Sequence, residues 1–229
     1  MYPTLAALFL AHVLADFVLQ TNAMVATKST PLTLAKHGAV VLVTAGLATA
    51  SYSPWLLLLT IAHLIIDLIK TRAPRSFWPF AIDQAAHAAT ILLAASLIPT
   101  NWPPATTAVM ALAAGAILAT RAGGFAVGLL MEPWAEAIAI GLTGAGRVIG
   151  NLERGLIFLL ILSGQTQNIG FLIAAKSVLR FGTVADDRKV SEYVIIGTLA
   201  SVCWAIAAAL LTTMLLNQLP TLGIPDLLP

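Results

Sequence analysis

Long apolar segments, separated by short polar connections, run along most of the chain. They predict helices at roughly 3–22, 34–51, 54–70, 78–98, 104–120, 146–163, 167–181 and 190–217. A helix needs about 20 mostly apolar residues to cross the hydrocarbon core of a bilayer, and these segments approach that length. The pattern therefore predicts an all-α, polytopic membrane helix bundle with about eight transmembrane helices.

The composition points to the same environment. Of the 229 residues, 59% are hydrophobic and 10% are charged, and the mean hydropathy is +0.92. An ordinary soluble domain carries about 25% charged residues, so that class is excluded. The net charge of +2 is small and the basic residues are dispersed, which gives no support to nucleic-acid binding. The single Cys203 forms no disulfide framework within one chain.

The basic residues indicate the orientation in the membrane. If the N-terminus lies outside, all 12 lysines and arginines fall in inner loops or at inner helix ends. This distribution is the one that the positive-inside rule describes. We therefore expect a multi-pass protein with both the N- and the C-terminus outside.

The segment 122–145 departs from the general pattern. It is apolar but contains two glutamates and Pro133, and its neighbours Arg121 and Arg147 must lie on the same side of the membrane. Two full crossings do not fit into a segment of this length. We therefore expect it to lie along the inner interface or to be re-entrant.

Two segments of the N-terminal half nearly repeat each other. AHVLADFVLQT at 11–21 and AHLIIDLIKTR at 62–72 both contain His-x-x-x-Asp, and each is followed by another histidine. The repeat predicts that the first four helices are an internally duplicated helical hairpin. We expect two units, residues 1–98 with the duplicated hairpins and residues 99–229 as a second helical membrane unit.

The repeated pattern places histidines and aspartates on four helices at a similar depth. Ionisable side chains in a membrane cost about 2.5–3.5 kcal/mol each, so such a set marks a functional site. Imidazole and carboxylate groups suit divalent metals such as Zn, Mn or Fe. We therefore predict a site for one divalent metal ion or two adjacent ones. Its predicted ligands are His12, Asp16, His37, His63, Asp67, Asp83 and His87.

Three further polar residues are predicted to lie beside the ligands or to face a substrate. They are Gln20, Lys70 and Gln84. Any single histidine is explained equally well by a hydrogen bond between helices, and Asp67 with Lys70 by an ion pair three residues apart. The common depth of the whole set favours the metal site. If the site is catalytic, the predicted catalytic groups are Asp16, Asp67 and Asp83.

A second group of polar residues follows in the C-terminal half. Basic side chains flanked by apolar residues recur on two predicted helices: Arg147, Arg154, Lys176 and Arg180. Guanidinium groups in such places often hold a phosphate or a carboxylate. Anchoring of the helices at the inner membrane surface explains the same residues, and both alternatives stay open.

Several of these segments carry a resemblance to a known family. They are AHVLADFVLQT with Lys28 and His37, then AHLIIDLIK and DQAAH, and later GRVIGNLERGLI, AAKSVLRF and SEYVIIGTLAS. They resemble an uncharacterised bacterial inner-membrane family catalogued as a domain of unknown function (family 3307). The resemblance covers most of the chain except 105–145 and implies a location in a prokaryotic inner membrane. A fainter likeness is to membrane-bound metal-dependent hydrolases, which also place histidines on spanning helices.

Three classes of function fit this pattern. The first is a metal-dependent hydrolase that acts on a phosphorylated, lipid-linked or membrane-associated substrate at the cytoplasmic leaflet. The second is a cation or proton-coupled transporter, although the outer half of each helix is nearly free of charge. The third is a structural membrane subunit that a metal ion braces. Membrane lipid is the expected partner in each case.

Overall fold

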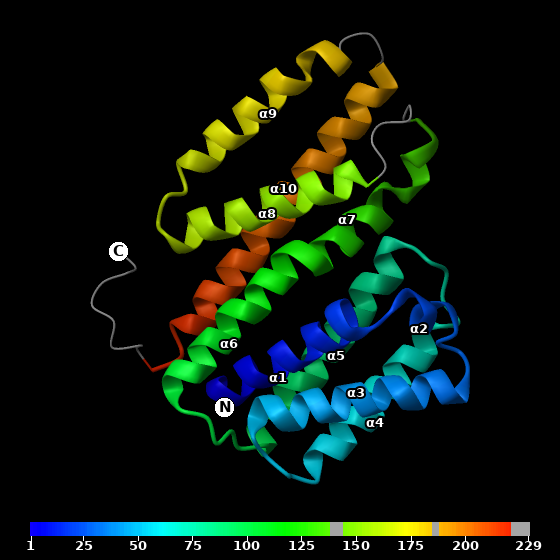
Figure 1. Cartoon of the computed structure of the whole chain (residues 1–229), viewed down its shortest axis with the longest axis vertical. Coiled ribbons are helices and arrows are strands. Elements are labelled where there is room, and N and C mark those ends of the chain that lie inside the picture. Colours follow the sequence, from blue (N-terminus) through cyan, green and yellow to red (C-terminus); the bar gives the residue numbers. More distant parts are fainter. Residues whose placement is uncertain (138–143, 185–187, 221–229) are drawn as a thin grey trace. The chain divides into compact units, whose positions relative to one another are not determined.

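The computed structural model describes residues 1–137, 144–184 and 188–220, with the side chains of 136–137 and 179–184 left out. Every regular element among these residues is a helix, and they contain no strand. The predicted all-α class is therefore confirmed (Figure 1). The described residues divide into two compact units, one formed by Met1–Ile117 with residues 214–220 and the other by the described part of residues 118–213.

The first unit contains six α-helices and one π-helical turn among its described residues. In chain order they are α1 (Tyr2–Leu14), the π-turn η1 (Ala15–Leu19), α2 (Asn22–Ala26), α3 (Pro31–Thr49), α4 (Trp55–Lys70), α5 (Phe77–Leu97) and α6 (Pro104–Ile117). Short polar segments separate them, as the sequence predicts. Thr30 caps α3 by accepting a hydrogen bond from the backbone N–H of Thr33, and Pro31 takes the first helical position.

The second unit contains the remaining helices. They are the π-turn η2 (Leu118–Ala122), α7 (Gly123–Met131), the 3₁₀-helix η3 (Glu132–Ala137), α8 (Ala145–Leu162), α9 (Asn168–Val184) and α10 (Arg188–Leu216), whose last residues belong to the first unit. The described part of the segment 122–145 is thus helical, and its residues 138–143 lie outside the described part. Its interfacial or re-entrant placement stays a prediction.

Five helices in the described part of the chain are long and apolar enough to cross a membrane. They are Tyr2–Leu19, Pro31–Thr49, Phe77–Leu97, Pro104–Ala135 and Arg188–Leu216. Large apolar side chains face outward along them, such as Leu47 at 70% and Leu93 at 66% exposure. Such surfaces are typical of helices that contact lipid.

The predicted number of eight crossings is not confirmed. The helix α4 has 16 residues and α9 has 17, so both are short for a full crossing. The helix α8 has 18 residues but carries Arg147, Glu153 and Arg154.

Small residues let the helices of the first unit approach closely. Ala6 on α1 packs with Ala108 and Ala111 on α6. Alanine has almost no side chain, so the two helix backbones come near each other, as is typical of helix packing in membranes. The helix α1 also packs on α3 and α5, and α4 packs on α3 and α5. The helix α1 therefore lies in the middle of the first unit (Figure 1).

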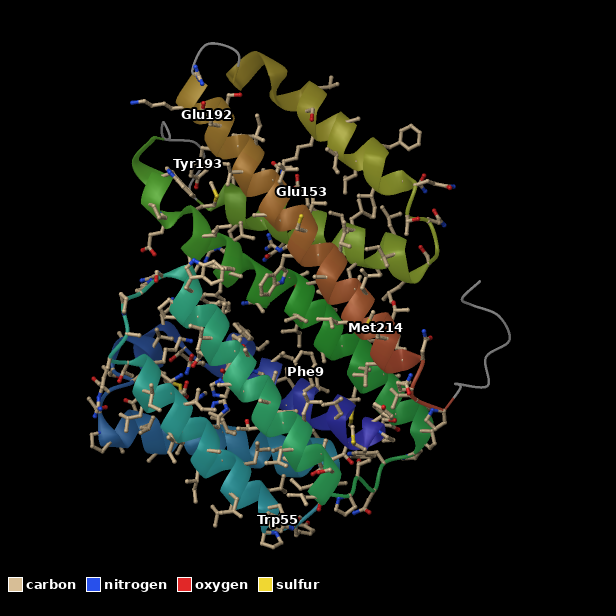
Figure 2. The ribbon with its side chains drawn as sticks, turned by 180° about the vertical axis from the view of Figure 1, so that it is seen from behind. Phe9, Trp55, Glu153, Glu192, Tyr193 and Met214 are labelled. Atoms are coloured by element: carbon tan, nitrogen blue, oxygen red, sulfur yellow. The ribbon has the colours of Figure 1, made fainter. Side chains whose placement is uncertain are left out.

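The apolar core of this unit forms a layer across four helices. It contains Ala7, Leu8, Ala11, Ala45, Ala48, Leu56, Leu59, Ile91, Ala94, Ala95 and Ile98. These residues come from the first part of α1 and α4 and from the last part of α3 and α5. In Figure 2 the side chain of Trp55 marks the N-terminal end of α4, beside this layer. Because neighbouring helices run in opposite directions, the opposite parts of the same helices meet in a second layer, which is polar.

Candidate metal centre

The polar layer brings together the histidines and aspartates of the repeated motif. His12 and Asp16 lie at the end of α1 and in η1, and His37 lies near the start of α3. His63 and Asp67 lie in the last turns of α4. Asp83 and His87 lie in the first half of α5, and all seven side chains are at most 8% exposed.

A π-turn shapes the end of the first helix. Asp16 lies within η1, where the helix is wider than an ordinary α-helix. Such turns often occur at functional sites. The helix then stops at Leu19, and Gln20 has an extended backbone with ψ of 112°. The first helix, predicted at roughly 3–22, therefore ends before Gln20, because the backbone leaves the helix after the π-turn.

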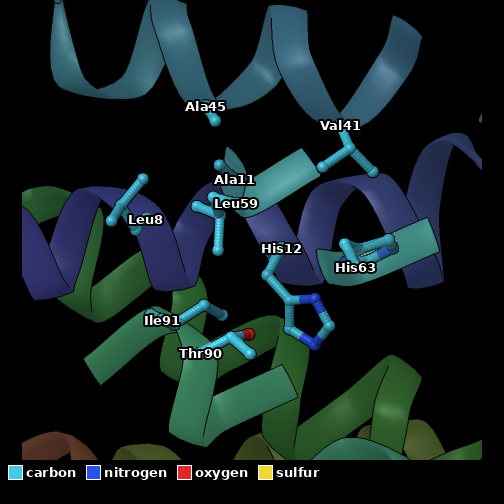
Figure 3. A pocket seen from close by; sticks show the side chains of 9 residues that line it. All are labelled: Leu8, Ala11, His12, Val41, Ala45, Leu59, His63, Thr90 and Ile91. Carbon is cyan, nitrogen blue, oxygen red and sulfur yellow. The ribbon is translucent and has the colours of Figure 1, made fainter. Parts of the chain in front are cut away.

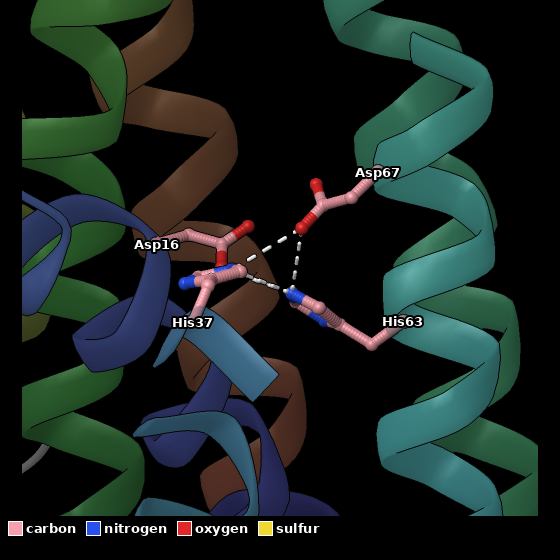
Figure 4. A group of neighbouring side chains, drawn as sticks. All are labelled: Asp16, His37, His63 and Asp67. Carbon is pink, nitrogen blue, oxygen red and sulfur yellow. Dashed lines mark hydrogen bonds and ion pairs between the residues drawn. The ribbon is translucent and has the colours of Figure 1, made fainter. Parts of the chain in front are cut away.

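Four side chains converge on one point (Figure 4). The Nε2 atoms of His37 and His63 lie 3.1 Å apart. Asp16 Oδ1 lies 3.3 Å from each of these nitrogens. Asp67 Oδ2 lies 3.2 Å from His37 Nε2 and 3.4 Å from His63 Nε2. Two nitrogen and two oxygen atoms thus form a compact cage between α1, α3 and α4.

The size of this cage fits a tetrahedral metal ion. Ligand atoms at about 2.0–2.1 Å from a zinc ion in a regular tetrahedron lie about 3.3–3.4 Å from one another. The five distances above are between 3.1 and 3.4 Å. The cage therefore has nearly the dimensions of a four-coordinate zinc site made of two histidines and two carboxylates.

The inward atoms of the carboxylates have no hydrogen-bond donor. Asp16 Oδ1 and Asp67 Oδ2 are buried and accept no hydrogen bond from the described residues. A buried carboxylate oxygen without a donor is costly, so such an atom calls for another cation or donor. A metal ion at the centre of the cage would serve both oxygens at once.

Two of the cage side chains, Asp67 and His37, have partners on their outward atoms. Lys28 donates a 2.7 Å hydrogen bond to Asp67 Oδ1. The side-chain amide of Gln20 lies 3.5 Å from His37 Nδ1. With His37 Nε2 as a metal ligand the ring proton would sit on Nδ1, and the amide of Gln20, turned over, would accept it through its oxygen. Groups behind the ligands orient them in known metal sites. Gln20 thus lies beside His37, as the sequence predicts. Lys28, which pairs with Asp67, was not among the predicted site residues.

A second group of ligands shares Asp67 with the first. Asp67, Asp83 and His87 offer three atoms that lie within 4.8 Å of one another. Asp83 Oδ1 and His87 Nε2 are buried and have no hydrogen-bond partner among the described residues; His87 Nδ1 lies 3.7 Å from Asp83 Oδ1. The other carboxylate oxygen, Asp83 Oδ2, accepts hydrogen bonds from Lys70 and from Gln84. As in the first group, the atoms that face the centre have no hydrogen-bond donor among the described residues, whereas the outward carboxylate oxygen accepts hydrogen bonds.

Lys70 pairs with Asp83 rather than with Asp67. Because Asp67 and Lys70 are three residues apart on α4, the sequence offered an ion pair between them. In the structure Lys28 instead pairs with the outward oxygen of Asp67, and Lys70 pairs with Asp83. Asp67 is buried in the cage, whereas the Lys70 side chain is 34% exposed. The ion pair that the sequence offered as an alternative explanation for Asp67 is therefore not formed.

His12 lies beside both groups without belonging to either. Its Nε2–H donates to Gln84 Oε1 over 3.2 Å, because an amide oxygen only accepts. Its ring stacks on His87, with 5.0 Å between the ring centroids. The two described ligand groups therefore contain six of the seven predicted ligands, and His12 packs against them.

A small cavity adjoins the histidines on the side of the apolar layer (Figure 3). His12, His63 and Thr90 are its polar lining residues, and the others are apolar, such as Leu8 and Ile91. Its volume is about 20 Å³, which is enough for one water molecule.

The predicted anion-binding residues lie in the second unit and have different surroundings. Arg154 is buried, and it donates hydrogen bonds to the carbonyls of Ala119 and Thr120 and to the side chains of Ser201 and Asn151. These bonds use four N–H groups, so they favour a structural role. Anion binding at Arg154 stays a prediction.

The other three predicted anion-binding residues share no common site in the described structure. Lys176 forms a 2.7 Å ion pair with Glu153, and Arg147 is exposed. The side chain of Arg180 lies outside the described residues. The structure therefore pairs Lys176 with an acidic group, and anion binding by this set stays a prediction.

Comparison with known proteins supports part of the resemblance seen in the sequence. A family model described as "Protein of unknown function (DUF3307)" matches residues 4–113. This confirms the resemblance for the part of the chain that contains both His-x-x-x-Asp motifs and all six residues of the ligand groups. The matched range ends before the C-terminal segments that also carry the resemblance. No curated protein and no solved structure matches the chain, and the likeness to metal-dependent hydrolases has no support from these comparisons.

Proposed function

We propose that the chain is an integral membrane protein that holds a divalent metal ion between α1, α3 and α4. The ligands are Asp16, His37, His63 and Asp67. The observation that carries this proposal is that five of the six distances between their four inward atoms lie at 3.1–3.4 Å, as in a tetrahedral ligand shell, and that the sixth is within 4.8 Å. Zinc is the favoured ion because it prefers four ligands in this geometry, whereas octahedral oxygen-rich sites suit Mn.

The metal content of the purified full-length protein tests this proposal. The protein in detergent is stripped with a chelator, dialysed against Zn²⁺, and examined by elemental analysis and zinc-edge X-ray absorption. We expect bound zinc with nitrogen and oxygen ligands at about 2.0–2.1 Å. His37→Ala and His63→Ala should each lose this ion. Thr60→Ala is the matched control, because the one hydrogen bond that its hydroxyl makes with the described residues is to the carbonyl of Leu56 on its own helix.

The reaction class that we propose is hydrolysis of a phosphorylated, membrane-associated substrate. A metal ion can activate water and polarise a phosphoryl oxygen. Lys28 and Lys70 add two positive charges next to the ligand carboxylates. The small cavity beside His12 and His63 has room for one water molecule. These features together suit a phosphate ester whose lipid part stays in the bilayer.

Phosphate release from a lipid substrate tests the reaction. Phosphatidic acid in vesicles is the lipid probe, and p-nitrophenyl phosphate is the soluble comparison. We expect zinc-dependent release from the lipid that is abolished in Asp16→Ala, while Thr60→Ala keeps the wild-type rate. Zinc binding without release from either compound would contradict the hydrolase proposal and leave the metal site intact.

A bracing role for the metal is the second candidate. Four protein ligands complete a tetrahedral shell, and such closed shells are typical of structural zinc sites. In this case metal removal unfolds the first unit, and no variant shows turnover. Circular dichroism of the metal-free protein separates the two candidates, since a catalytic ion can be removed from a protein that stays folded.

The proposed location is a bacterial inner membrane, with both termini outside. The support is the family match over residues 4–113 and the distribution of the basic residues. A reporter fused after Pro229 should be active outside the cytoplasm. A reporter that is active only in the cytoplasm would overturn this orientation.

A further inference from the structure

We infer that the centre holds a second metal ion, bound by Asp67, Asp83 and His87. This inference rests on the proposed function, because the two ions share Asp67. It adds an ion with fewer protein ligands, and therefore a place where a water molecule or a phosphate oxygen can bind.

The hydrogen bond of His87 fixes which of its nitrogens is free. His87 Nδ1 lies 2.9 Å from the backbone carbonyl oxygen of Asp83. A carbonyl only accepts, so Nδ1 carries the proton and the neutral ring leaves a lone pair on Nε2. This Nε2 atom is buried and has no donor among the described residues. The His87 side chain is 1% exposed.

Asp83 presents a second acceptor in the same place. Its Oδ2 atom already accepts hydrogen bonds from Lys70 and Gln84. Its Oδ1 atom is buried and has no donor in the described part of the chain. Two acceptors without a proton between them do not satisfy each other, and a cation satisfies both.

Asp67 completes the group and joins it to the first. One of its oxygens lies within 4.8 Å of the ligand atoms of Asp83 and His87. The neighbouring ring of His63 packs on His87, with 4.1 Å between the centroids. The two ligand groups are therefore adjacent, and carboxylates that bridge two ions about 3.5–4 Å apart are typical of two-metal hydrolytic sites.

The two positions differ in the number of protein ligands. The first has four, which is a complete tetrahedral shell, and the second has three. Catalytic zinc sites have three protein ligands and an open position for water or substrate. The second position is therefore the one where a phosphate oxygen would bind, and the first holds the ligands in place.

Metal stoichiometry tests the second site. Full-length wild-type protein in detergent should bind two Zn²⁺ per chain after stripping and dialysis. His87→Ala and the isosteric Asp83→Asn should each bind one, and Asp67→Ala should lose both. Ser96→Ala is the matched control on α5, since its exposed hydroxyl bonds only to the carbonyl of Leu93. Elution volume and circular dichroism establish that each variant is folded.

A second measurement uses Mn²⁺ as a paramagnetic probe. Two manganese ions that share a carboxylate should show magnetic coupling in the electron paramagnetic resonance spectrum. The coupling should disappear in Asp83→Asn, even if that variant still binds one ion. One ion per wild-type chain, lost in His37→Ala and kept in His87→Ala, would overturn the second site while the proposed function stands. No ion in the wild type would overturn both.

Discussion

The Nε2 atoms of His37 and His63 lie 3.1 Å apart, although 26 positions separate the two residues in the chain. Two imidazole nitrogens at this distance share one proton or hold one metal ion. The inward oxygens of Asp16 and Asp67 lie 3.2–3.4 Å from both nitrogens. A metal ion at the centre would serve both nitrogens and both carboxylate oxygens at once, so this arrangement favours a metal ion.

Removal of the metal should lower the thermal stability of the protein. A ligand at 100 times its Kd stabilises the folded state by about 2.7 kcal/mol. Thermal unfolding in detergent should therefore show a lower Tm after chelation, and added Zn²⁺ should restore it. The double variant of His37→Ala and His63→Ala should not respond to the chelator. An unchanged Tm in the chelated wild type would contradict metal binding in the folded protein.

Lys28→Met should make the protein more dependent on metal. Lys28 is the described partner of the outward oxygen of Asp67, so without it the metal-free centre has one less positive charge beside a buried carboxylate. Loss of one partner of a buried pair costs about 3–5 kcal/mol, and less here because the lysine is partly exposed. The drop in Tm on chelation should therefore be larger than in the wild type. A drop of equal size would show that Lys28 does not compensate Asp67.

Gly38 controls how closely α3 approaches α4. A Cβ atom at Gly38 would lie 2.8 Å from Leu64 Cδ1, which is too near for an ordinary contact. Gly38→Leu should therefore push α3 away, widen the gap between His37 and His63, and weaken zinc binding although no ligand is changed. Isothermal titration with Zn²⁺ measures this effect. Adding Leu64→Ala should restore part of the affinity, and a lack of any rescue would speak against this contact as the cause.

The two glutamines should affect the two metal positions separately. Gln20 lies behind His37, and Gln84 lies behind Asp83 and His12. Loss of a group that orients a ligand typically lowers metal affinity roughly 10–100-fold. Gln20→Leu should therefore weaken the four-ligand position and Gln84→Leu the three-ligand position. Zinc titrations of both variants against the wild type test this, and equal effects on both positions would contradict it.

Arg154→Leu should destabilise the second unit without changing the metal content. The guanidinium satisfies two carbonyls at the π-turn η2, and loss of it leaves buried acceptors that each cost about 1–3 kcal/mol. Chemical or thermal unfolding should show this loss, while zinc per folded chain stays at the wild-type value. A fully stable variant with weaker binding of phosphate would instead support the predicted anion site.

The sequence predicts the helices well because their hydrophobic runs are long. The helix α3 starts at Pro31, three residues before the predicted start at 34, because Thr30 and Pro31 are helix-starting residues that the hydrophobic pattern does not register. The end of the first helix is different, since the π-turn at Asp16 leaves no simple mark in the hydrophobic pattern. That is why Gln20 was expected on the helix.

The grouping of the histidines and aspartates could be predicted from the sequence, but their hydrogen-bond partners could not. His-x-x-x-Asp places two polar side chains on one helix face, and the repetition shows which faces meet. The choice of Lys28 for Asp67 and of Lys70 for Asp83 depends on how three helices and a connection pack. Sequence spacing alone would pair each carboxylate with the lysine nearest to it in the chain. In the structure Asp67 pairs with Lys28, which is 39 positions away, rather than with Lys70.

The apolar layer of Leu8, Ala45, Leu59 and Ile91 separates the centre from one end of the first unit. An ion would have to shed its water to pass through such a layer, so it should exchange with only one of the two compartments. The metal supply and the pH of that compartment alone would then decide how fully the centre is loaded. In sealed vesicles, a membrane-impermeant chelator should strip the protein from that side and leave it loaded when it is added to the other.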